Sequence, residues 1–269
     1  MKQKPKLGQN FLVDDAARYA IVDALGDLSK RTVIEIGPGH GSITEILATR
    51  CHKLIALELD PSLAAGLTFH FRGHANVQIV AADVLKTDFQ ALVAEEETAD
   101  VIGNLPYYIT SDILLHLFKA STTGILSRAV LMMQREVAER VSATPGVRDY
   151  GLLSATAQMN AQVESLFTLP PSAFSPPPEV YSSVLRLHFA TRFAELNVDP
   201  EGFDIFLRKC FAQKRKTLWN NLRAAEHPTE QLAAAWPSSI PALARGESLT
   251  LEQMAELYRA LSTGSQENL

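Results

Sequence analysis

The fold is decided by the stretch TVIEIGPGHGS, residues 32–42. Its first half is a short, β-branched apolar run, which is typical of a strand buried on both faces. Three glycines and a serine follow, so the stretch predicts a strand, a tight turn and a helix. In open α/β sheets such a turn lies at the carboxyl end of a strand, where ligands bind. We therefore expect a ligand site at Gly37, Gly39 and Gly41.

The spacing of the glycines narrows the choice of ligand. A pyrophosphate-binding loop has the pattern Gly-x-Gly-x-x-Gly, but position 42 is Ser, and the chain has no P-loop with Gly-Lys-Ser or Gly-Lys-Thr. The loop therefore favours a nucleoside that lacks a pyrophosphate. The alternative is a plain tight turn, in which the nearby acids only cap helices.

Four further apolar runs predict strands that alternate with helices. The strands are expected at residues 53–59, 77–83, 100–105 and 128–134. Helices are expected at 15–25 with Asp14 as cap, at 43–50 after Ser42, from Pro61 to near Gly73, and at 112–119 after Ser111. This alternation predicts an α/β fold in which a mostly parallel sheet carries helices on both faces.

The pattern changes after about residue 160. Residues 164–169 and 182–189 predict two more strands, and the proline-rich segment 170–178 between them has no helical pattern. So short a connection favours an antiparallel pair. From residue 199 the chain is helical in pattern, with a last helix expected at 249–261. We therefore predict one domain at 1–190 and a small all-helical domain at 191–269.

Two acids are expected at the ends of neighbouring strands. Glu58 ends the second strand, 21 residues after Gly37, and Asp83 ends the third. A carboxylate at the first of these positions can accept hydrogen bonds from both ribose hydroxyls. One at the second can accept a hydrogen bond from an adenine amino group. Because parallel strands end at the same edge of a sheet, the acids and the glycine loop together predict a site for an adenine nucleoside.

Composition limits the class of protein. The chain has 269 residues, of which 46% are hydrophobic and 20% charged, as in an ordinary globular protein. Its net charge of -5 does not by itself predict a nucleic-acid partner. Cys51 and Cys210 lie in no metal-ligand spacing, and no apolar run reaches the roughly 18 residues of a membrane span. We expect a cytoplasmic protein that needs no metal, no membrane and no disulfide.

The fourth strand ends in the motif GNLPYY, residues 103–108. Asn-Leu-Pro-Tyr in this place resembles the signature of amino-group methyltransferases that use S-adenosylmethionine (SAM). Four other stretches resemble the ribosomal RNA adenine dimethyltransferases, namely GQNFL at 8–12, YGLLS at 150–154, FSPPPEV at 174–180 and KRKTLWNNL at 214–222. The matches span about residues 6–223, and the resemblance is greatest to the bacterial small-subunit type of this family.

The resemblance implies a Rossmann-like, SAM-dependent methyltransferase domain followed by a helical domain that contacts RNA. It implies that SAM is held by Gln9, Asn10, Leu12, Glu35, Gly37, Gly39, Gly41, Glu58, Leu59, Asp83, Val84 and Asn104. It also implies an acceptor site of Asn104, Leu105, Pro106, Tyr107 and Phe174. We expect Tyr108 to be a packing residue.

The acceptor residues suit the methylation of an adenine amino group. The lone pair of this nitrogen is delocalised into the ring, so the nitrogen is a poor nucleophile. The side-chain oxygen of Asn104 and the carbonyl oxygen of Leu105 can each accept an amino hydrogen and hold the nitrogen in a reactive shape. Pro106 stiffens the turn. Tyr107 offers a face on which the base can stack, and Phe174 is expected to cover the other face.

RNA contacts are expected at a basic cluster in the helical region. Its members are Arg208, Lys209, Lys214, Arg215, Lys216 and Arg223, and no acid lies among them. Lys2, Lys4 and Lys6 form a second cluster. Phosphate binding depends on such clusters more than on net charge. The alternative is an ordinary solvated helix face.

Three positions depart from the usual residues of the family. Trp219 stands in place of a basic residue, and Glu179 and Tyr181 flank Val180 where Lys and Asp are usual. These departures concern the RNA contacts rather than methyl transfer.

The resemblance also implies a substrate. It is the small ribosomal subunit, whose 16S RNA receives two methyl groups on each of two adjacent adenines in its 3′-terminal hairpin loop during assembly. We expect the chain to act as a monomer. The alternatives are the large-subunit methyltransferase type of macrolide resistance and a non-catalytic RNA-binding or assembly factor on the same fold.

Overall fold

The computed structural model describes residues 10–93, 97–225 and 227–263. They form two compact units. The first unit contains the chain up to Ala138 and the segment Ala161–Ala190, and the second contains Glu139–Asn160 and the chain from Thr191. The chain thus enters the second unit twice, whereas the sequence pattern predicted a single change of domain at residue 190.

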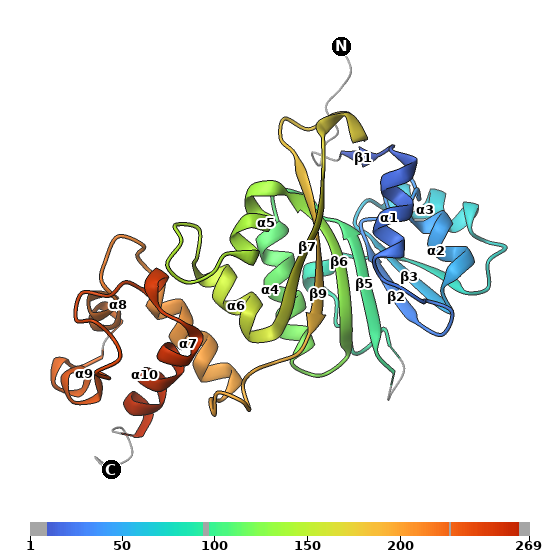
Figure 1. Cartoon of the computed structure of the whole chain (residues 1–269). Coiled ribbons are helices and arrows are strands. Elements are labelled where there is room, and N and C mark those ends of the chain that lie inside the picture. Colours follow the sequence, from blue (N-terminus) through green and yellow to red (C-terminus); the bar gives the residue numbers. More distant parts are fainter. Residues whose placement is uncertain (1–9, 94–96, 226, 264–269) are drawn as a thin grey trace. The chain divides into compact units, whose positions relative to one another are not determined.

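The first unit is built on a seven-stranded sheet (Figure 1). Its strands are β2 (Thr32–Ile36), β3 (Lys53–Glu58), β4 (Val77–Ala81), β5 (Ala99–Asn104), β6 (Leu126–Gln134), β7 (Ala161–Leu169) and β9 (Ser182–Phe189). Their order in the sheet is β4-β3-β2-β5-β6-β9-β7. The first five strands in this order, β4-β3-β2-β5-β6, pair in parallel. Strand β9 pairs antiparallel with both β6 and β7. The expected α/β class, with a mostly parallel sheet and an antiparallel last pair, is confirmed.

Helices cover both faces of the sheet (Figure 1). Helices α1 (Asp15–Asp23), α2 (Thr44–Arg50) and α3 (Pro61–His70) lie on one side, and α4 (Thr110–Ser121) lies on the other. Because the central strands are covered twice, every residue of β2 is buried. This double coverage is the reason that the strands read as continuous apolar runs.

The helix starts agree only in part with the expected caps. Asp14 caps α1 as predicted, since its side chain accepts a hydrogen bond from the first turn. Ser42 and Ser111 do not cap, because α2 begins beyond Ser42, α4 begins before Ser111, and neither helix has a side-chain cap. Backbone bonds already turn the chain ahead of α2, where the Gly41 N–H donates to the Pro38 carbonyl at 2.9 Å.

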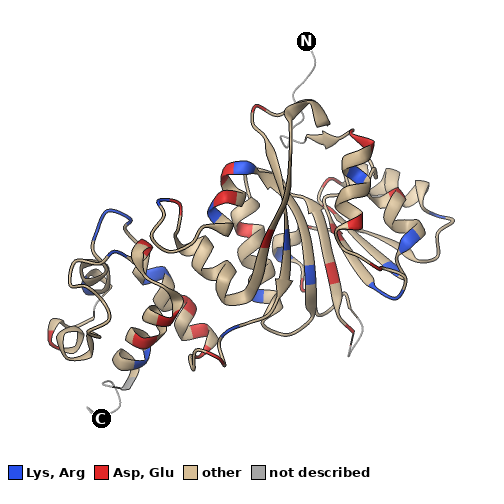
Figure 2. Ribbon diagram, in the orientation of Figure 1, with Lys and Arg blue, Asp and Glu red and all other residues tan. Residues whose placement is uncertain are grey.

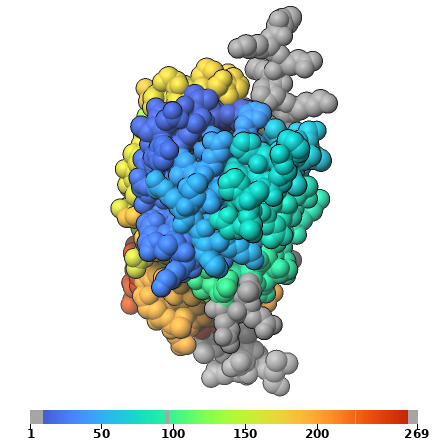
Figure 3. Space-filling model, turned by 90° about the vertical axis from the view of Figure 1, so that its right-hand side faces the viewer, coloured from blue at the N-terminus to red at the C-terminus, as the bar shows by residue number. Residues whose placement is uncertain are grey.

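A two-stranded sheet joins segments that are far apart in the chain. Strand β1 (Phe11–Leu12) pairs antiparallel with β8 (Phe174–Ser175), and a 3-10 helix (Pro171–Ala173) precedes β8. On the face seen in Figure 3, the yellow proline-rich segment lies against the blue N-terminal segment. The residue pattern at 170–178 predicted only a loop, because a two-residue strand has no periodicity to detect.

Within its described residues, the second unit has only helical secondary structure. Its helices are α6 (Leu152–Asn160), α7 (Pro200–Cys210), α8 (Leu218–Ala224), α9 (Thr229–Ala235) and α10 (Leu251–Thr263), together with a 3-10 helix (Gly246–Ser248) and the second half of α5 (Arg135–Ser142). Tyr150 is buried in the same apolar cluster as Phe203, Leu222 and Met254. This shared core explains why residues 139–160 belong to the second unit.

Two further findings hold for residues 10–93, 97–225 and 227–263. None of their helices combines the length and the hydropathy that crossing a bilayer would take. No three His, Cys, Asp or Glu side chains gather there in a way that could hold a metal ion.

A buried carboxylate, Asp100, links three neighbouring strands at the end of the sheet where the parallel strands begin. Asp100 of β5 has no exposed surface and accepts two hydrogen bonds from the Arg31 guanidinium, at 3.0 Å each, and two from that of Arg128, at 3.2 and 2.6 Å. Arg31 precedes β2 and Arg128 lies on β6, so one carboxylate joins both neighbours of its strand. The hydrogen bonds to Asp100 raise the pKa of Arg31.

We predict that Asp100→Ala lowers the free energy of unfolding by about 3 kcal/mol, because it leaves two guanidinium groups facing each other without their shared partner. Urea denaturation measures this change. The control is Asp23→Ala, which removes an exposed ion pair with Arg50 and should cost less than about 1 kcal/mol. Equal losses of unfolding free energy in the two variants would show that the buried Asp100 ion pairs stabilise the fold no more than an exposed ion pair does.

Candidate active site

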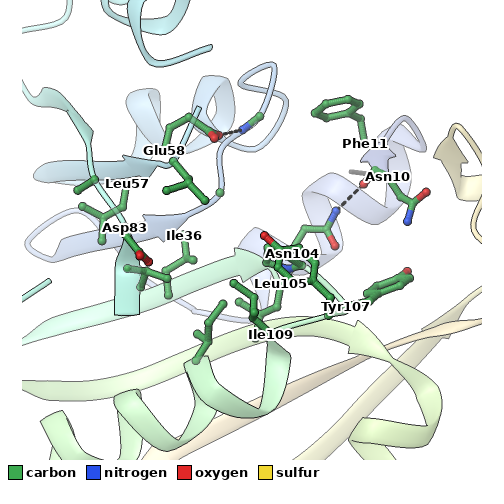
Figure 4. Close-up of a pocket in the computed structure, with 18 residues that line it drawn as sticks. Asn10, Phe11, Ile36, Leu57, Glu58, Asp83, Asn104, Leu105, Tyr107 and Ile109 are labelled. Carbon is green, nitrogen blue, oxygen red and sulfur yellow. Dashed lines mark hydrogen bonds between the residues drawn. The ribbon is translucent and has the colours of Figure 1, made fainter. Parts of the chain in front are cut away.

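The candidate active site is a pocket at the carboxyl ends of β2, β3, β4 and β5 (Figure 4). Its lining residues are Asn10, Phe11, Ile36, Gly37, Gly39, Leu57, Glu58, Leu59, Ala82, Asp83, Val84, Asn104, Leu105, Pro106, Tyr107, Tyr108, Ile109 and Ile113. In the close-up, Glu58 and Asp83 lie towards one end and Asn104 and Tyr107 towards the other. The pocket therefore has two halves, each with its own polar groups.

Most of the site residues predicted from the sequence line this pocket. They are Asn10, Gly37, Gly39, Glu58, Leu59, Asp83, Val84, Asn104, Leu105, Pro106 and Tyr107. The predicted residues Leu12, Glu35, Gly41 and Phe174 are described but do not line it. The predicted residue Gln9 lies outside the described residues, as do Lys2, Lys4 and Lys6.

The glycine loop needs its glycines for conformation and for space. Gly37 and Gly39 have φ angles of 68° and 60°, in the left-handed region that other residues avoid. A Cβ atom on Gly39 would lie 2.8 Å from the ring of Phe11, which is closer than real Cβ contacts. The Phe11 ring also packs on His40, with centroids 4.2 Å apart. Strand β1 therefore rests directly on the loop.

Glu58 is built into the pocket wall by backbone hydrogen bonds. Its side chain is buried, and its two carboxylate oxygens accept from the Gly39 N–H at 3.0 Å and from the Asp60 N–H at 2.9 Å. Each carboxylate oxygen has a second lone pair. The same carboxylate can thus hold the glycine loop and accept hydrogen bonds from two hydroxyl groups of a ligand.

Asp83 caps a short helix and also faces the pocket. Its carboxylate caps a 3-10 helix (Val84–Lys86) by accepting from the Leu85 N–H at 3.0 Å. It also lines the pocket at the end of β4. A capping role and a ligand role are therefore compatible at this position.

Glu35 lies under the glycine loop rather than in the pocket. Its side chain is buried and accepts a hydrogen bond from the Thr44 hydroxyl at 2.7 Å. Burial raises the pKa of Glu35 to about 8, and the nearby Glu58 carboxylate adds to the increase. At neutral pH this carboxyl group is therefore mainly protonated, and it ties the start of α2 to β2 without placing a second charge beside Glu58.

Asn104 is oriented by the N-terminal segment. Its amide nitrogen donates a hydrogen bond to the Asn10 carbonyl oxygen at 2.8 Å (Figure 4). A carbonyl oxygen accepts and does not donate, so this contact fixes which end of the amide is nitrogen. The Asn104 side-chain oxygen is consequently the end left to accept a hydrogen bond from a ligand in the pocket.

Tyr107 is held by its hydroxyl group. The hydroxyl lies 2.6 Å from the hydroxyl oxygen of Ser182, the first residue of β9. Burial raises the pKa of the Tyr107 phenol, so it stays neutral. Leu105 uses its N–H in a 2.9 Å bond to the Met132 carbonyl, which keeps the turn attached to β6. The Tyr107 ring thus lines the pocket and is held in position by its hydroxyl group.

Two expectations about aromatic residues differ from the structure. Phe174 is only 3% exposed and belongs to the buried apolar cluster of the first unit, together with Leu12 and Leu169. Tyr108 was expected to pack, but it is 59% exposed and lines the pocket. The pairing of β1 with β8 accounts for the burial of Phe174, since it sets Phe174 opposite Leu12.

Sequence reasoning missed several lining residues, namely Phe11, Ile36, Leu57, Ala82, Tyr108, Ile109 and Ile113. Ile36, Leu57 and Ala82 stand next to predicted polar residues at the strand ends. A rule that takes both residues at each strand end would have found them. Phe11 had no such signal, because its position depends on the pairing of β1 with β8.

The basic cluster belongs to the second unit. Lys214, Arg215 and Lys216 are exposed on the loop between α7 and α8, which shows as blue in Figure 2. Arg208 pairs with Asp204 at 2.8 Å, and Lys209 lies 3.4 Å from the His227 ring. A shallow cavity is lined by Gln213, Lys216, Asn220, Arg223 and Ala224. The Lys214 ammonium also donates to the Arg148 carbonyl oxygen. Part of the cluster is therefore open to a ligand and part is engaged in internal contacts.

The raised pKa of Glu35 predicts a pH dependence of stability. Between about pH 4.5 and 8 the folded state keeps a proton that the unfolded state has lost, so stability falls as the pH rises through this window. We expect Glu35→Gln to remove this fall, so that its free energy of unfolding exceeds that of the parent chain by a margin that grows from pH 5 to 8. Urea denaturation at several pH values measures it. The control is the exposed Glu136→Gln, and parallel curves for Glu35→Gln and the parent chain would contradict the prediction.

The pocket fits SAM. Its adenosyl half can lie where Glu58 has lone pairs for two ribose hydroxyls, beside the Asp83 carboxylate and the apolar side chains of Ile36, Leu57 and Val84. The glycine loop allows close approach of a ligand to the backbone. The other half, at Asn10 and Asn104, adjoins the acceptor residues.

Comparison with known proteins gives relatives over nearly the whole chain. The chain is 57% identical, over 98% of its length and 93% of the relative's, to ribosomal RNA small subunit methyltransferase A of Acidobacterium capsulatum. It is 48% identical to the protein of the same name of Koribacter versatilis, over 97% and 95% of the two chains.

Solved structures have the same fold. The crystal structure of a dimethyladenosine transferase from Plasmodium falciparum superposes with a TM-score of 0.77 at 24% identity, covering 95% of this chain and 98% of that one. The 23S rRNA methyltransferase ErmE gives a TM-score of 0.68 at 25% identity, covering 94% and 100%. The Rossmann-like methyltransferase fold expected from the motifs is confirmed.

A family model described as ribosomal RNA adenine dimethylase matches residues 1–262. The match covers the glycine loop, the Asn104–Tyr107 motif and the basic cluster together, as the motifs predicted. The chain belongs to the ribosomal RNA adenine dimethylase family, and it is a SAM-dependent RNA adenine methyltransferase.

Proposed function

We propose that this chain dimethylates the N6 amino groups of two adjacent adenines in the 3′-terminal hairpin loop of 16S RNA, during assembly of the small ribosomal subunit. The observation that carries the proposal is the acceptor turn, where Asn104 is oriented with its oxygen available to an amino group. The choice of the small subunit is supported by the names of relatives that are 57% and 48% identical.

The chain's own residues account for the activation of the acceptor. The methyl group comes from SAM bound in the pocket. The Asn104 side-chain oxygen and the Leu105 carbonyl oxygen accept the two amino hydrogens, which favours a pyramidal nitrogen whose lone pair is less delocalised into the ring and can attack the methyl group. After one transfer, N6-methyladenine still has one amino hydrogen, so one of the two acceptors remains engaged. The same turn can therefore serve both transfers.

Tyr107 supplies a stacking face for the base. Its ring is fixed by the hydroxyl contact with Ser182, so little conformational freedom is lost when a base stacks on it. Stacking of this kind is worth about 1–3 kcal/mol per base. For Phe174 to cover the second face, its side chain has to leave the core in which it is now buried.

The pocket can accept only a base that is not stacked in an RNA helix. A base can reach Asn104 only if it is unstacked and turned out of its helix, which costs least in a loop. We assign the phosphate contacts to Lys214, Arg215, Lys216 and Arg223, which are exposed in the structure. We propose the cytoplasm as the setting and a monomer as the acting form.

We predict that Asn104→Ala abolishes both methyl transfers, with kcat lowered at least about 100-fold, as expected when a transition-state hydrogen-bond partner is removed. Single-turnover transfer of labelled methyl from SAM to unmethylated small subunits measures it. The thermal unfolding midpoint checks that the variant is folded. Retained dimethylation in a folded Asn104→Ala protein would overturn the assigned role.

The substrate is tested by offering the chain unmethylated small subunits and, in parallel, large subunits with labelled SAM, followed by nucleoside analysis. We expect N6,N6-dimethyladenosine from small subunits alone. Label only in large subunits would reassign the chain to the resistance-type activity. Tight binding to small subunits without transfer would identify a binding or assembly factor instead.

A further inference from the structure

Tyr181 is an exposed aromatic residue at the edge of the first unit. Its exposed fraction is 47%, and that of its neighbour Val180 is 42%. The next residue, Ser182, is fully buried and begins β9. The Tyr181 side chain is therefore carried at the point where the proline-rich segment enters the sheet. Single exposed aromatics are common on protein surfaces, so its surroundings decide whether it has a role.

The side chain of an arginine lies over the Tyr181 ring. The Arg135 guanidinium carbon lies 5.4 Å from the centre of the Tyr181 ring, a cation–π distance. The Arg135 N–H also donates to the Tyr181 carbonyl oxygen at 3.0 Å. This bond extends the ladder of β6 and β9 by one residue beyond the pair Gln134 and Ser182. Backbone and side chain together hold the Tyr181–Arg135 pair in place.

The pair is connected to the acceptor half of the pocket through Ser182 and Tyr107. Ser182, next to Tyr181, contacts the Tyr107 hydroxyl at 2.6 Å, and Tyr107 lines the pocket. Arg135 follows the carboxyl end of β6, which is parallel to β5, the strand that carries Asn104. A polynucleotide that inserts one base at Asn104 therefore has its neighbouring nucleotides near this edge.

The charges around Tyr181 favour contact with a base over contact with a phosphate. Glu179 and Glu136 are both exposed, two residues from Tyr181 and one residue from Arg135 in the chain. Their carboxylates offset the attraction of Arg135 for a phosphate group. The face of a purine or pyrimidine is uncharged and stacks on any aromatic ring regardless of sequence.

We propose that the Tyr181–Arg135 pair is a second stacking subsite, which binds the base of a nucleotide that flanks the target adenine. The inference rests on the proposed function, because it takes the substrate to be an RNA loop. The subsite holds the strand beside the pocket and takes no part in methyl transfer.

The test compares Tyr181→Ala, Tyr181→Phe and Tyr19→Ala in the full chain, using unmethylated small subunits as the probe. Tyr19 is the matched control, because it is 50% exposed and also carries an arginine, Arg50, 5.6 Å from its ring centre. Arg50 ends α2 and lies just before β3, so this pair is at the opposite edge of the sheet from the pocket.

We expect Tyr181→Ala to raise the Kd for small subunits about 10-fold, in the range of one lost stacking contact. The kcat at saturating subunits and the Kd for SAM should not change. Tyr181→Phe keeps the ring and should bind as the parent chain does, and Tyr19→Ala should stay within about 2-fold. The slope of log Kd against log salt should be the same in Tyr181→Ala as in the parent chain, because no phosphate contact is lost.

Three results would overturn the inference. They are unchanged binding by Tyr181→Ala, an equal loss in Tyr181→Phe or Tyr19→Ala, and a reduced salt slope in Tyr181→Ala. The proposed function fails separately, if the parent chain forms no N6,N6-dimethyladenosine in small subunits. The ratio of the Kd of Tyr181→Ala to that of the parent chain is measured by binding and does not require methyl transfer. Failure of the stacking subsite and failure of the proposed function are therefore distinguishable.

Discussion

The parallel register of β2, β3 and β5 is the constraint on which the site depends. Ile36 is paired with Leu57 on one side and with Gly103 on the other, so the next residues in the chain, Gly37, Glu58 and Asn104, emerge at one edge. A shift of one residue would send each side chain to the opposite face of the sheet. The ion pairs of Asp100 with Arg31 and Arg128 oppose such a shift, because they tie β5 to both of its neighbours. The register of the core thereby fixes the spacing between the cofactor half and the acceptor half of the pocket.

The N-terminal segment links these two halves. Its strand β1 is paired with β8, its Phe11 ring rests on the glycine loop, and the Asn10 carbonyl orients the Asn104 amide. Three contacts from distant parts of the chain therefore hold one short segment. The Asn10 carbonyl that orients Asn104 and the Phe11 ring that packs on the glycine loop are adjacent on it, so the pairing of β1 with β8 supports both contacts.

The parts of the fold that could be predicted depend on local signals. The strands were found because burial on both faces produces β-branched apolar runs, and Glu58 and Asp83 followed from where such strands end. The burial of Phe174 and the membership of residues 139–160 in the second unit could not be found in this way. Each depends on contacts between segments that are far apart in the chain, and no local pattern encodes them. The motif resemblance placed Asn104 in the acceptor site, but only the structure shows which backbone carbonyl orients its amide.

The net charge of -5 is compatible with an RNA substrate because the two units offer different chemistry. The second unit carries the exposed residues Lys214, Arg215 and Lys216 on the α7–α8 loop, where the proposed phosphate contacts would release counterions and depend on salt. The first unit has a pocket lined by neutral amide, carbonyl and phenol groups on its acceptor side. A base that enters this pocket is recognised by hydrogen bonds and stacking, which need no positive charge.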